Sequence, residues 1–187
     1  MTGLVILDRD GVINEDSDRY IRSLDEWHPI PGSIEAIARL SQAGLRVAVA
    51  TNQSGLSRGY FGLDDLEAIH ADLCARVEAA GGRIDAIAYC PHLPTEGCDC
   101  RKPRTGLLDA LQRELALPLT GAPFVGDSLK DLQAAEQCGC RPMLVTTGKG
   151  AATRAALDAS DVDLQNPGAV AVFPDLAAAV TAILEDS

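Results

Sequence analysis

The chain has 187 residues, of which 47% are hydrophobic, 23% charged and 4% aromatic, the proportions of an ordinary soluble domain. A total of 16 Lys and Arg against 27 Asp and Glu gives a net charge of −11, which argues against non-specific binding to nucleic acid or to an anionic membrane. No apolar stretch is long enough to cross a bilayer, and the first residues do not resemble a signal peptide. We therefore expect a cytosolic protein with a single domain over 1–187 and no membrane partner. The sequence carries no signal for the oligomeric state, and we take a monomer as the default.

Short apolar runs alternate with helix-like patterns along nearly the whole chain. In order, we predict a strand at 4–7, a helix at 33–43, a strand at 45–50, a helix at 64–80, a strand at 84–89, a helix at 107–116, a strand at 123–125, a helix at 128–137, strands at 143–145 and 170–173, and a helix at 175–185. Near-continuous apolarity is typical of strands buried on both faces. The repeated βα order predicts an α/β fold, with a doubly wound, mainly parallel sheet covered by helices on both faces.

The first predicted strand ends in two carboxylates. Asp8 lies at its tip and Asp10 follows two residues later, with Gly11 allowing a sharp turn. Ligands of open α/β sheets bind at the carboxyl ends of the strands, and two adjacent carboxylates repel each other unless a cation or a proton lies between them. The motif alone is explained equally well by a solvated acidic turn.

The second predicted strand runs into the segment T-N-Q-S-G. The Thr51 hydroxyl, the Asn52 amide and the backbone N–H groups of the turn are suitable donors to the oxygens of a phosphoryl group. An ordinary strand-to-loop turn explains this segment as well. Arg58, further along the same loop, is a candidate contact for a distal part of a substrate.

The clearest helical pattern lies at 64–80. Four apolar residues recur there at helical spacing, namely Leu66, Ile69, Leu73 and Val77. Asp64 and Glu67 have the spacing of a capping box at the start, and Gly81 follows as a stop signal. We therefore predict an amphipathic helix that covers the sheet.

A cysteine-rich loop at 90–104 carries the most specific metal-binding pattern. It contains a C-x-H-x5-C-x-C array made by Cys90, His92, Cys98 and Cys100. Three thiolates and one imidazole complete a tetrahedral Zn²⁺ shell, and a shell of four protein ligands is structural rather than catalytic. Free thiols in a loop are the alternative. Cys138 and Cys140 have no His or further Cys nearby, and we expect them to be thiols without a metal.

Positive charge is concentrated directly after this array. Arg101, Lys102 and Arg104 fall within four residues of an otherwise acidic chain. An acidic protein that handles a phosphate must gather its cations locally, although a solvated basic loop would have the same sequence. Lys102 is therefore a candidate phosphate ligand.

A further acidic pair follows the strand at 123–125, in the segment F-V-G-D-S-L-K-D. Asp127 lies at the strand end and is the natural third oxygen donor for Mg²⁺, a hard cation that prefers oxygen ligands. Asp131, one turn into the next helix, has two possible roles: it coordinates the ion through water, or it only hydrogen-bonds the loop.

Together these motifs, D-R-D-G-V, T-N-Q-S-G, the Lys of C-R-K-P and G-D-S-x-x-D, resemble those of the haloacid-dehalogenase-like phosphatase superfamily. The cysteine loop resembles that of its small capless branch, which includes heptose-bisphosphate and histidinol-phosphate phosphatases. The resemblance implies Asp8 as the nucleophile that forms an aspartyl-phosphate and Asp10 as the acid and base. It also implies Mg²⁺ held by Asp8, the Asp10 carbonyl and Asp127. Ser128 stands where some relatives carry a second acidic residue.

The resemblance also implies a set of contacts to a phosphorylated sugar. The implied substrate-binding residues are Asp16, Tyr20, Thr51, Asn52, Gln53, Ser54, Arg58, Arg101 and Lys102. The segment N-Q-S-G-L-S-R-G-Y-F is more similar to the heptose-bisphosphate enzymes, which implies hydrolysis of the 7-phosphate of a heptose 1,7-bisphosphate in lipopolysaccharide precursor synthesis. Two alternatives stay open: a histidinol-phosphate phosphatase, and a zinc-stabilised module that binds phosphosugars without turnover.

Overall fold

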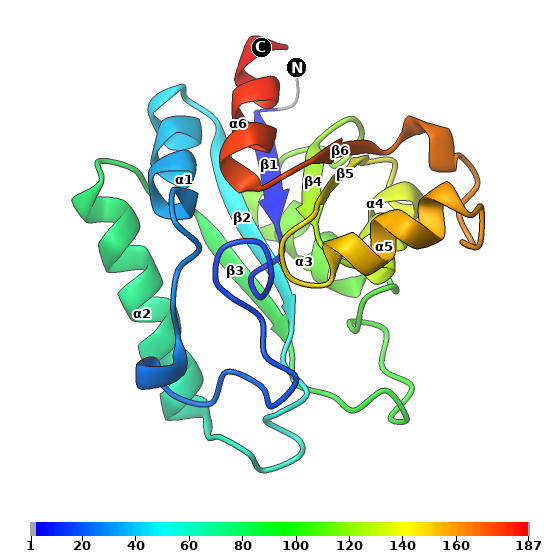
Figure 1. Ribbon diagram of the computed structural model, residues 1–187. Helices are drawn as coiled ribbons and strands as arrows, with labels where there is room; N and C mark the ends of the chain where they lie inside the picture. The colour runs from blue at the N-terminus through cyan, green and yellow to red at the C-terminus, as the bar shows by residue number, and fades with distance from the viewer. Residues whose placement is uncertain (1–2, 187) are drawn as a thin grey trace.

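A computed structural model describes residues 3–186 and contains one six-stranded sheet. The strands are β1 (Leu4–Leu7), β2 (Arg46–Asn52), β3 (Ala86–Cys90), β4 (Pro123–Gly126), β5 (Arg141–Val145) and β6 (Ala171–Phe173). They lie in the order β3-β2-β1-β4-β5-β6, and every neighbouring pair is parallel (Figure 1). The predicted doubly wound α/β fold is therefore confirmed.

Within residues 3–186, six α-helices connect and follow the strands. They are α1 (Ser33–Gln42), α2 (Leu63–Ala79), α3 (Gly106–Leu115), α4 (Leu129–Gln137), α5 (Gly150–Asp158) and α6 (Leu176–Glu185), with short 3-10 turns η1 (Leu24–Glu26) and η2 (Pro167–Ala169). The sequence pattern did not predict α5, η1 or η2. In α5 the only large apolar side chain is Leu157, so the segment has no apolar stripe that would mark a helix. None of the helices within residues 3–186 is long and apolar enough to span a membrane.

The two faces of the sheet carry separate cores because side chains alternate along each strand. On β1, Val5 and Leu7 pack into a core shared with α1, α2 and α6, whereas Leu4 and Ile6 face a second core with α3 and α4. All four side chains are buried. Burial on both faces explains why the strands have continuous apolar sequences.

Helix α2 buries the predicted apolar face, but it begins one residue earlier than predicted. The buried residues are Leu66, Ile69, Leu73 and Val77. The N-cap is Gly62, whose backbone N–H donates to Oδ2 of Asp65 at 2.8 Å. The predicted Asp64–Glu67 capping box is therefore wrong: with Leu63 already helical, Asp64 lies inside the first turn, and Asp65 is the residue three after the cap.

Candidate active site

The three adjacent strands β2, β1 and β4 bring the predicted motifs together at one edge of the sheet. Asp8 follows β1, Thr51 lies at the end of β2 and Asp127 follows β4. The three residues line one cavity of about 380 Å³. The site lies where the strand order reverses: the chain proceeds from β1 to β2 and β3 on one side and then crosses to β4 on the other side of β1. Such a switch point is the usual place for a ligand crevice in open α/β sheets.

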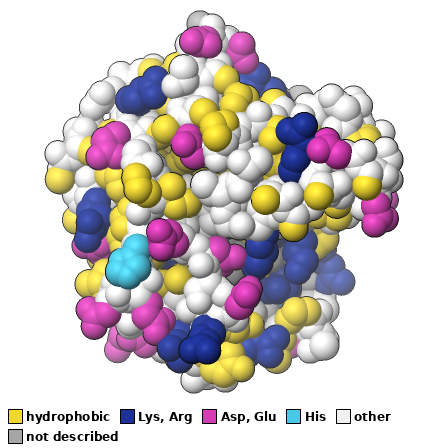
Figure 2. All heavy atoms as spheres, viewed as in Figure 1, with side chains coloured by type: hydrophobic (Ala, Val, Ile, Leu, Met, Phe, Trp, Pro, Cys, Tyr) yellow, Lys and Arg dark blue, Asp and Glu magenta, His cyan; other side chains and the backbone are white. Residues whose placement is uncertain are grey.

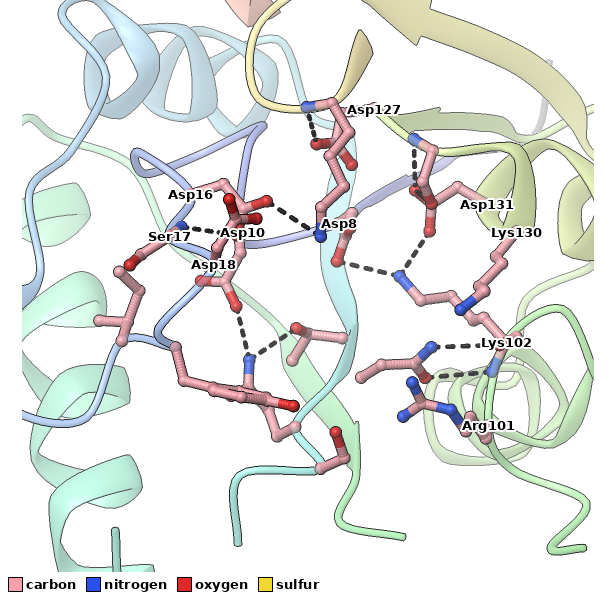
Figure 3. Close-up of a pocket in the computed structure, with 18 of the residues that line it drawn as sticks. Asp8, Asp10, Asp16, Ser17, Asp18, Arg101, Lys102, Asp127, Lys130 and Asp131 are labelled. Atoms are coloured by element: carbon pink, nitrogen blue, oxygen red, sulfur yellow. Dashed lines mark hydrogen bonds and ion pairs between the residues drawn. The ribbon is translucent and has the colours of Figure 1, made fainter. Parts of the chain in front are cut away.

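Lys102 reaches into the centre of this cavity from the loop after β3. Its Nζ lies 2.9 Å from Oδ1 of Asp8 and 2.6 Å from Oδ1 of Asp131, and it donates to the carbonyl of Ala50 at 2.7 Å. Figure 3 shows the ammonium between the two carboxylates. Only 2% of the Lys102 residue is exposed, so this charge is held in place by its partners rather than by water. Asp131 therefore fixes Lys102, and its Oδ2 also accepts from the backbone N–H and hydroxyl of Ser128.

The buried carboxylates shift one another's protonation. Burial and the neighbouring charge of Asp131 raise the pKa of Asp8 well above its usual value, although Lys102 acts in the opposite direction. Burial and Asp131 also raise the pKa of Asp127, to about 7. Burial alone would lower the pKa of Lys102, but the charges of Asp131 and Asp8 outweigh it and raise the pKa. Without a bound cation, burial and mutual repulsion therefore favour the protonated forms of Asp8 and Asp127.

The acidic cluster has the donor set of a Mg²⁺ site. Asp8, Asp127 and Asp131 are buried and each offers a carboxylate oxygen within 4.8 Å of the others. Mg²⁺ prefers oxygen ligands, and its positive charge would compensate the negative charge of the three carboxylates. Oδ2 of Asp127 accepts the backbone N–H of Lys149 at 2.8 Å, so its position is fixed by the loop after β5.

Asp10 lies beside this cluster and has different partners. Its carboxylate is ion-paired with Arg9 and accepts hydrogen bonds from the amide groups of Asn14 and Gln53. Burial alone would raise the pKa of Asp10, but the Arg9 charge and these hydrogen bonds lower it below the usual value. Its side chain is thus separate from the three-carboxylate cluster.

Most of the predicted substrate residues line the cavity. These are Asp16, Tyr20, Thr51, Asn52, Gln53, Ser54, Arg101 and Lys102. The Asn52 amide is already engaged on both atoms, donating to the Lys102 carbonyl and accepting from the Lys102 N–H, both at 3.1 Å, so it holds the Lys102 loop. Arg58 is exposed on the β2–α2 loop and is not among the residues that line this cavity.

The charges around the cavity are unevenly distributed. Asp10, Asp16 and Asp18 lie on one side, whereas Arg101, Lys102 and Lys130 lie on the other (Figure 3). Figure 2 shows Lys and Arg side chains gathered on one side of a hollow on this face, with acidic side chains opposite. Asp18, Lys130 and Lys149 line the cavity without having been predicted from the sequence. Lys149 lies in the T-G-K-G segment and forms an ion pair with Asp16 at 3.1 Å.

The predicted zinc ligands come together next to the active site. Sγ of Cys90 lies 3.7 Å from Sγ of Cys98 and 3.2 Å from Sγ of Cys100, and Nδ1 of His92 lies 3.2 Å from Sγ of Cys100. Tetrahedral Zn²⁺ with sulfur ligands at about 2.3 Å separates the sulfurs by about 3.8 Å. The four ligand atoms lie within 4.8 Å of one another, so the cluster has the composition and size of a closed zinc shell.

Comparisons with known proteins agree with this site. The HAD-hydrolase-like family model matches residues 99–179. The chain is 54% identical over 182 residues to D-glycero-beta-D-manno-heptose-1,7-bisphosphate 7-phosphatase of Pseudomonas aeruginosa, covering 97% of this chain and 98% of the relative. It is 48% identical over 184 residues to the enzyme of the same name from Bordetella bronchiseptica, covering 98% of this chain and 99% of the relative.

Solved structures give the same result. The D,D-heptose 1,7-bisphosphate phosphatase of B. bronchiseptica, complexed with magnesium and phosphate, superposes with a TM-score of 0.91 at 48% identity over 100% of both chains. The corresponding enzyme of Burkholderia thailandensis superposes with a TM-score of 0.73 at 41% identity over 97% of both chains. The chain therefore belongs to the HAD-like hydrolase family, as a phosphatase of the branch that contains the heptose-bisphosphate phosphatases.

Proposed function

We propose that this chain, as a single phosphatase domain over 1–187, hydrolyses the 7-phosphate of D-glycero-D-manno-heptose 1,7-bisphosphate with Mg²⁺, in the supply of ADP-heptose for lipopolysaccharide. The observation that carries the proposal is the buried Lys102, ion-paired with both Asp8 and Asp131 beside Asp127. A buried ammonium among three carboxylates is a costly arrangement that suits the binding of a phosphoryl group. The full-length similarity to named heptose-bisphosphate phosphatases supports the choice of substrate.

Asp8 is the nucleophile of the proposed reaction. Its Oδ1 accepts the Arg9 backbone N–H at 2.7 Å and the Lys102 ammonium at 2.9 Å, so the orientation of the carboxylate is fixed. In the proposed reaction a carboxylate oxygen of Asp8 bonds to phosphorus while the bond from phosphorus to the sugar oxygen breaks. When bound by Asp8, Asp127 and the Asp10 carbonyl, Mg²⁺ would neutralise charge on the two anions.

Asp10 transfers a proton in both halves of this reaction, first as a general acid and then as a general base. In the first half it protonates the departing sugar oxygen, and in the second it accepts a proton from the water that attacks phosphorus and releases phosphate from Asp8. Because its pKa is held below the usual value, Asp10 is a carboxylate in the free protein. An approaching phosphate dianion raises the pKa of a neighbouring carboxyl group, so we expect Asp10 to gain its proton as the substrate binds.

The two sides of the cavity suit the two ends of the substrate. Lys102 and Thr51 are positioned for the phosphoryl group that reacts, and Arg101 with Lys130 forms a cationic side for a second phosphate. Asp16 on the opposite side, and Tyr20, which also lines the cavity, can contact the sugar hydroxyls. Arg58 remains a predicted contact that requires its exposed loop to approach the bound sugar.

We also propose Zn²⁺ in the Cys90, His92, Cys98 and Cys100 cluster as a structural ion. The cluster lies directly before Arg101 and Lys102 in the chain. A metal held there would fix the loop that presents both cations to the substrate.

Phosphate release by the purified protein with Mg²⁺ tests the proposed function. We expect a much higher kcat/KM for the heptose bisphosphate than for histidinol phosphate. The same assay with the α and β anomers of the 1-phosphate measures which anomer the enzyme prefers. The names of the relatives disfavour the histidinol-phosphate alternative. The reverse preference in this assay would refute the heptose assignment.

An Asp8→Asn variant tests the chemistry separately. We expect it to fold and to lose phosphate release at least about 10³-fold, because the amide is a poor nucleophile. Undiminished release by this variant would exclude Asp8 as the nucleophile. No release by the wild-type protein with any of these substrates would instead favour the phosphosugar-binding module.

A further inference from the structure

Arg9 is a charged residue buried completely between the two aspartates of the first motif. Its exposed fraction is 0%, although it lies between Asp8 and Asp10, which both line the cavity. Arg9 stands in the bend after β1, and it does not line the cavity that its two neighbours line. A buried guanidinium is costly unless each of its donors has a partner, so its contacts show what it does.

The guanidinium of Arg9 binds both oxygens of the Asp10 carboxylate. Its Nε donates to Oδ1 of Asp10 at 2.9 Å and its Nη2 donates to Oδ2 at 3.1 Å. Each oxygen also has a second donor: the Asn14 amide meets Oδ1 and the Gln53 amide meets Oδ2, both at 2.9 Å. Nη2 also lies 2.9 Å from Oδ1, so each oxygen of the Asp10 carboxylate is held by the planar guanidinium and by one amide.

The remaining terminal nitrogen of Arg9 is held by a residue from α2. Nη1 of Arg9 lies 3.2 Å from Nε2 of His70, which is 61 residues away in the chain. A guanidinium only donates, so this contact requires an unprotonated Nε2 and places the ring proton on Nδ1. Burial, followed by the Arg9 charge, lowers the pKa of His70 to about 4, which keeps the ring neutral at neutral pH.

We propose that Arg9 is a positioning residue that holds Asp10 in the orientation for proton transfer, and that His70 in turn holds Arg9. The proposal rests on the proposed function only in taking Asp10 as the acid and base. It adds a connection between the active site and α2 through two residues that do not line the cavity. Lys at position 9 would keep the positive charge but lose the planar two-point contact.

The test compares leaving groups in an Arg9→Lys variant. A sugar alkoxide needs a proton from Asp10 to depart, whereas nitrophenolate departs without one. We therefore expect kcat for a primary alkyl phosphate to fall about 10- to 100-fold, the lower part of the range for acid–base catalysis, with KM changing less than about threefold. With p-nitrophenyl phosphate we expect a rapid burst of about one nitrophenolate per site and then slow turnover, because water activation by Asp10 is also impaired.

An Arg154→Lys variant is the matched control, because Arg154 is exposed on α5 and pairs only with Asp158 among the contacts of the described chain. It should behave as wild type with both substrates. An Arg9→Lys variant that slows the initial burst of nitrophenolate as much as it slows alkyl-phosphate hydrolysis, or that only raises KM, would overturn the proposal. Either result would show that Arg9 supports the fold or substrate binding instead.

A pair of His70 variants keeps the test valid if Arg9→Lys does not fold. His70→Gln retains a neutral acceptor for Arg9, whereas His70→Leu removes it. We expect His70→Leu to lower kcat for the alkyl phosphate about 3- to 10-fold while leaving the nitrophenolate burst unchanged. His70→Gln should keep most of the wild-type kcat. Wild-type activity in both variants would overturn the role of His70, and with an unfolded Arg9→Lys it would overturn the whole proposal.

These outcomes are independent of the identity of the natural substrate. The comparison uses whichever primary alkyl phosphate the wild-type protein hydrolyses, so an incorrect heptose assignment appears in the wild-type substrate profile. A failure of the Arg9 proposal appears only in the ratio between variant and wild type.

Discussion

The Asp127 carboxylate packs against the backbone of Gly11 and Gly148 and accepts a hydrogen bond from one backbone N–H. A Cβ atom built on Gly11 would lie 2.1 Å from Oδ2 of Asp127, and one built on Gly148 would lie 2.3 Å from the same oxygen. The Lys149 N–H donates to that oxygen at 2.8 Å. This carboxylate is thus positioned by backbone from two separate loops, and burial raises its pKa to about 7.

The raised pKa of Asp127 predicts that Mg²⁺ binding strengthens as the pH rises. The ion must displace the proton, so we expect the affinity to be about tenfold higher at pH 8 than at pH 6. Titration calorimetry with the metal-free protein measures this difference. An affinity that is equal at the two pH values would contradict the placement of Asp127 in the ion's shell.

The same shift predicts how the stability of the metal-free protein changes with pH. The folded protein holds the Asp127 proton up to about pH 7, whereas the unfolded chain releases it near its ordinary pKa of about 3.9. The stabilisation from this group is therefore present at low pH and is lost as the pH rises through 7. Thermal unfolding of an Asp127→Asn variant serves as the control, because its stability should lack this part of the pH dependence.

Among the loops, the one between β5 and α5 packs closely against the active site. Its Thr147 hydroxyl donates to the Gly11 carbonyl at 2.6 Å, and Gly148 lies against Asp127. The loop therefore connects two strand ends that the chain separates by more than a hundred residues.

A Gly148→Ala substitution should weaken Mg²⁺ binding. The new methyl group would displace the Asp127 carboxylate, and we expect at least about a tenfold loss of affinity in addition to about 1 kcal/mol for the left-handed backbone. Gly121→Ala is the matched control, because Gly121 also has a positive φ (77°) but nothing within 4 Å of the added carbon. Gly148→Ala should lose more stability than Gly121→Ala, because its added carbon would also lie 2.5 Å from Cα of Gly11, and only Gly148→Ala should lose Mg²⁺ affinity. Equal Mg²⁺ affinity in both variants would refute this account.

The cysteine loop is the second element whose role can be tested. Arg104 donates to the Cys98 carbonyl and Arg101 donates to the His92 carbonyl at 3.3 Å, so hydrogen bonds connect both basic residues to the cluster of cysteines and histidine. A Cys98→Ser substitution should therefore lower the zinc content, the melting temperature and the activity together. Cys74→Ser on α2, outside the cluster, should change none of the three. Unchanged melting and zinc content in Cys98→Ser would refute a structural zinc ion.

At the scale of the whole molecule, the surface predicts a monomer. Among residues 3–186 the exposed large hydrophobic side chains are Leu24, Tyr60 and Leu63. Three side chains are too few for a stable interface, which buries about 800 Å² on each partner. Sedimentation at micromolar concentration should therefore give a mass near 19.6 kDa, and a concentration-independent mass of twice that value would contradict the prediction.

Much of the fold could be predicted from local sequence pattern. The predicted strand at 4–7 matches β1. The other predicted strands and helices match observed elements, and their ends differ by no more than two residues. Continuous apolarity and turn residues are properties of neighbouring positions, so the chain itself displays them. Helix α5 was missed because its packing depends on Gly150 and Thr153, whose buried positions no apolar pattern marks.

The residue types of the active site are also evident from the order of residues along the chain. Which carboxylates, cations and thiols are available, and that they follow strand ends, can be read along the chain, because ligand chemistry resides in side-chain type and spacing. Their partners become visible only in the folded protein: Asp131 with Lys102, Arg9 with Asp10 and His70, and Asn52 with the Lys102 backbone. Pairing across strands and helices depends on the direction and distance of side chains in space, and separation along the chain carries no information about either.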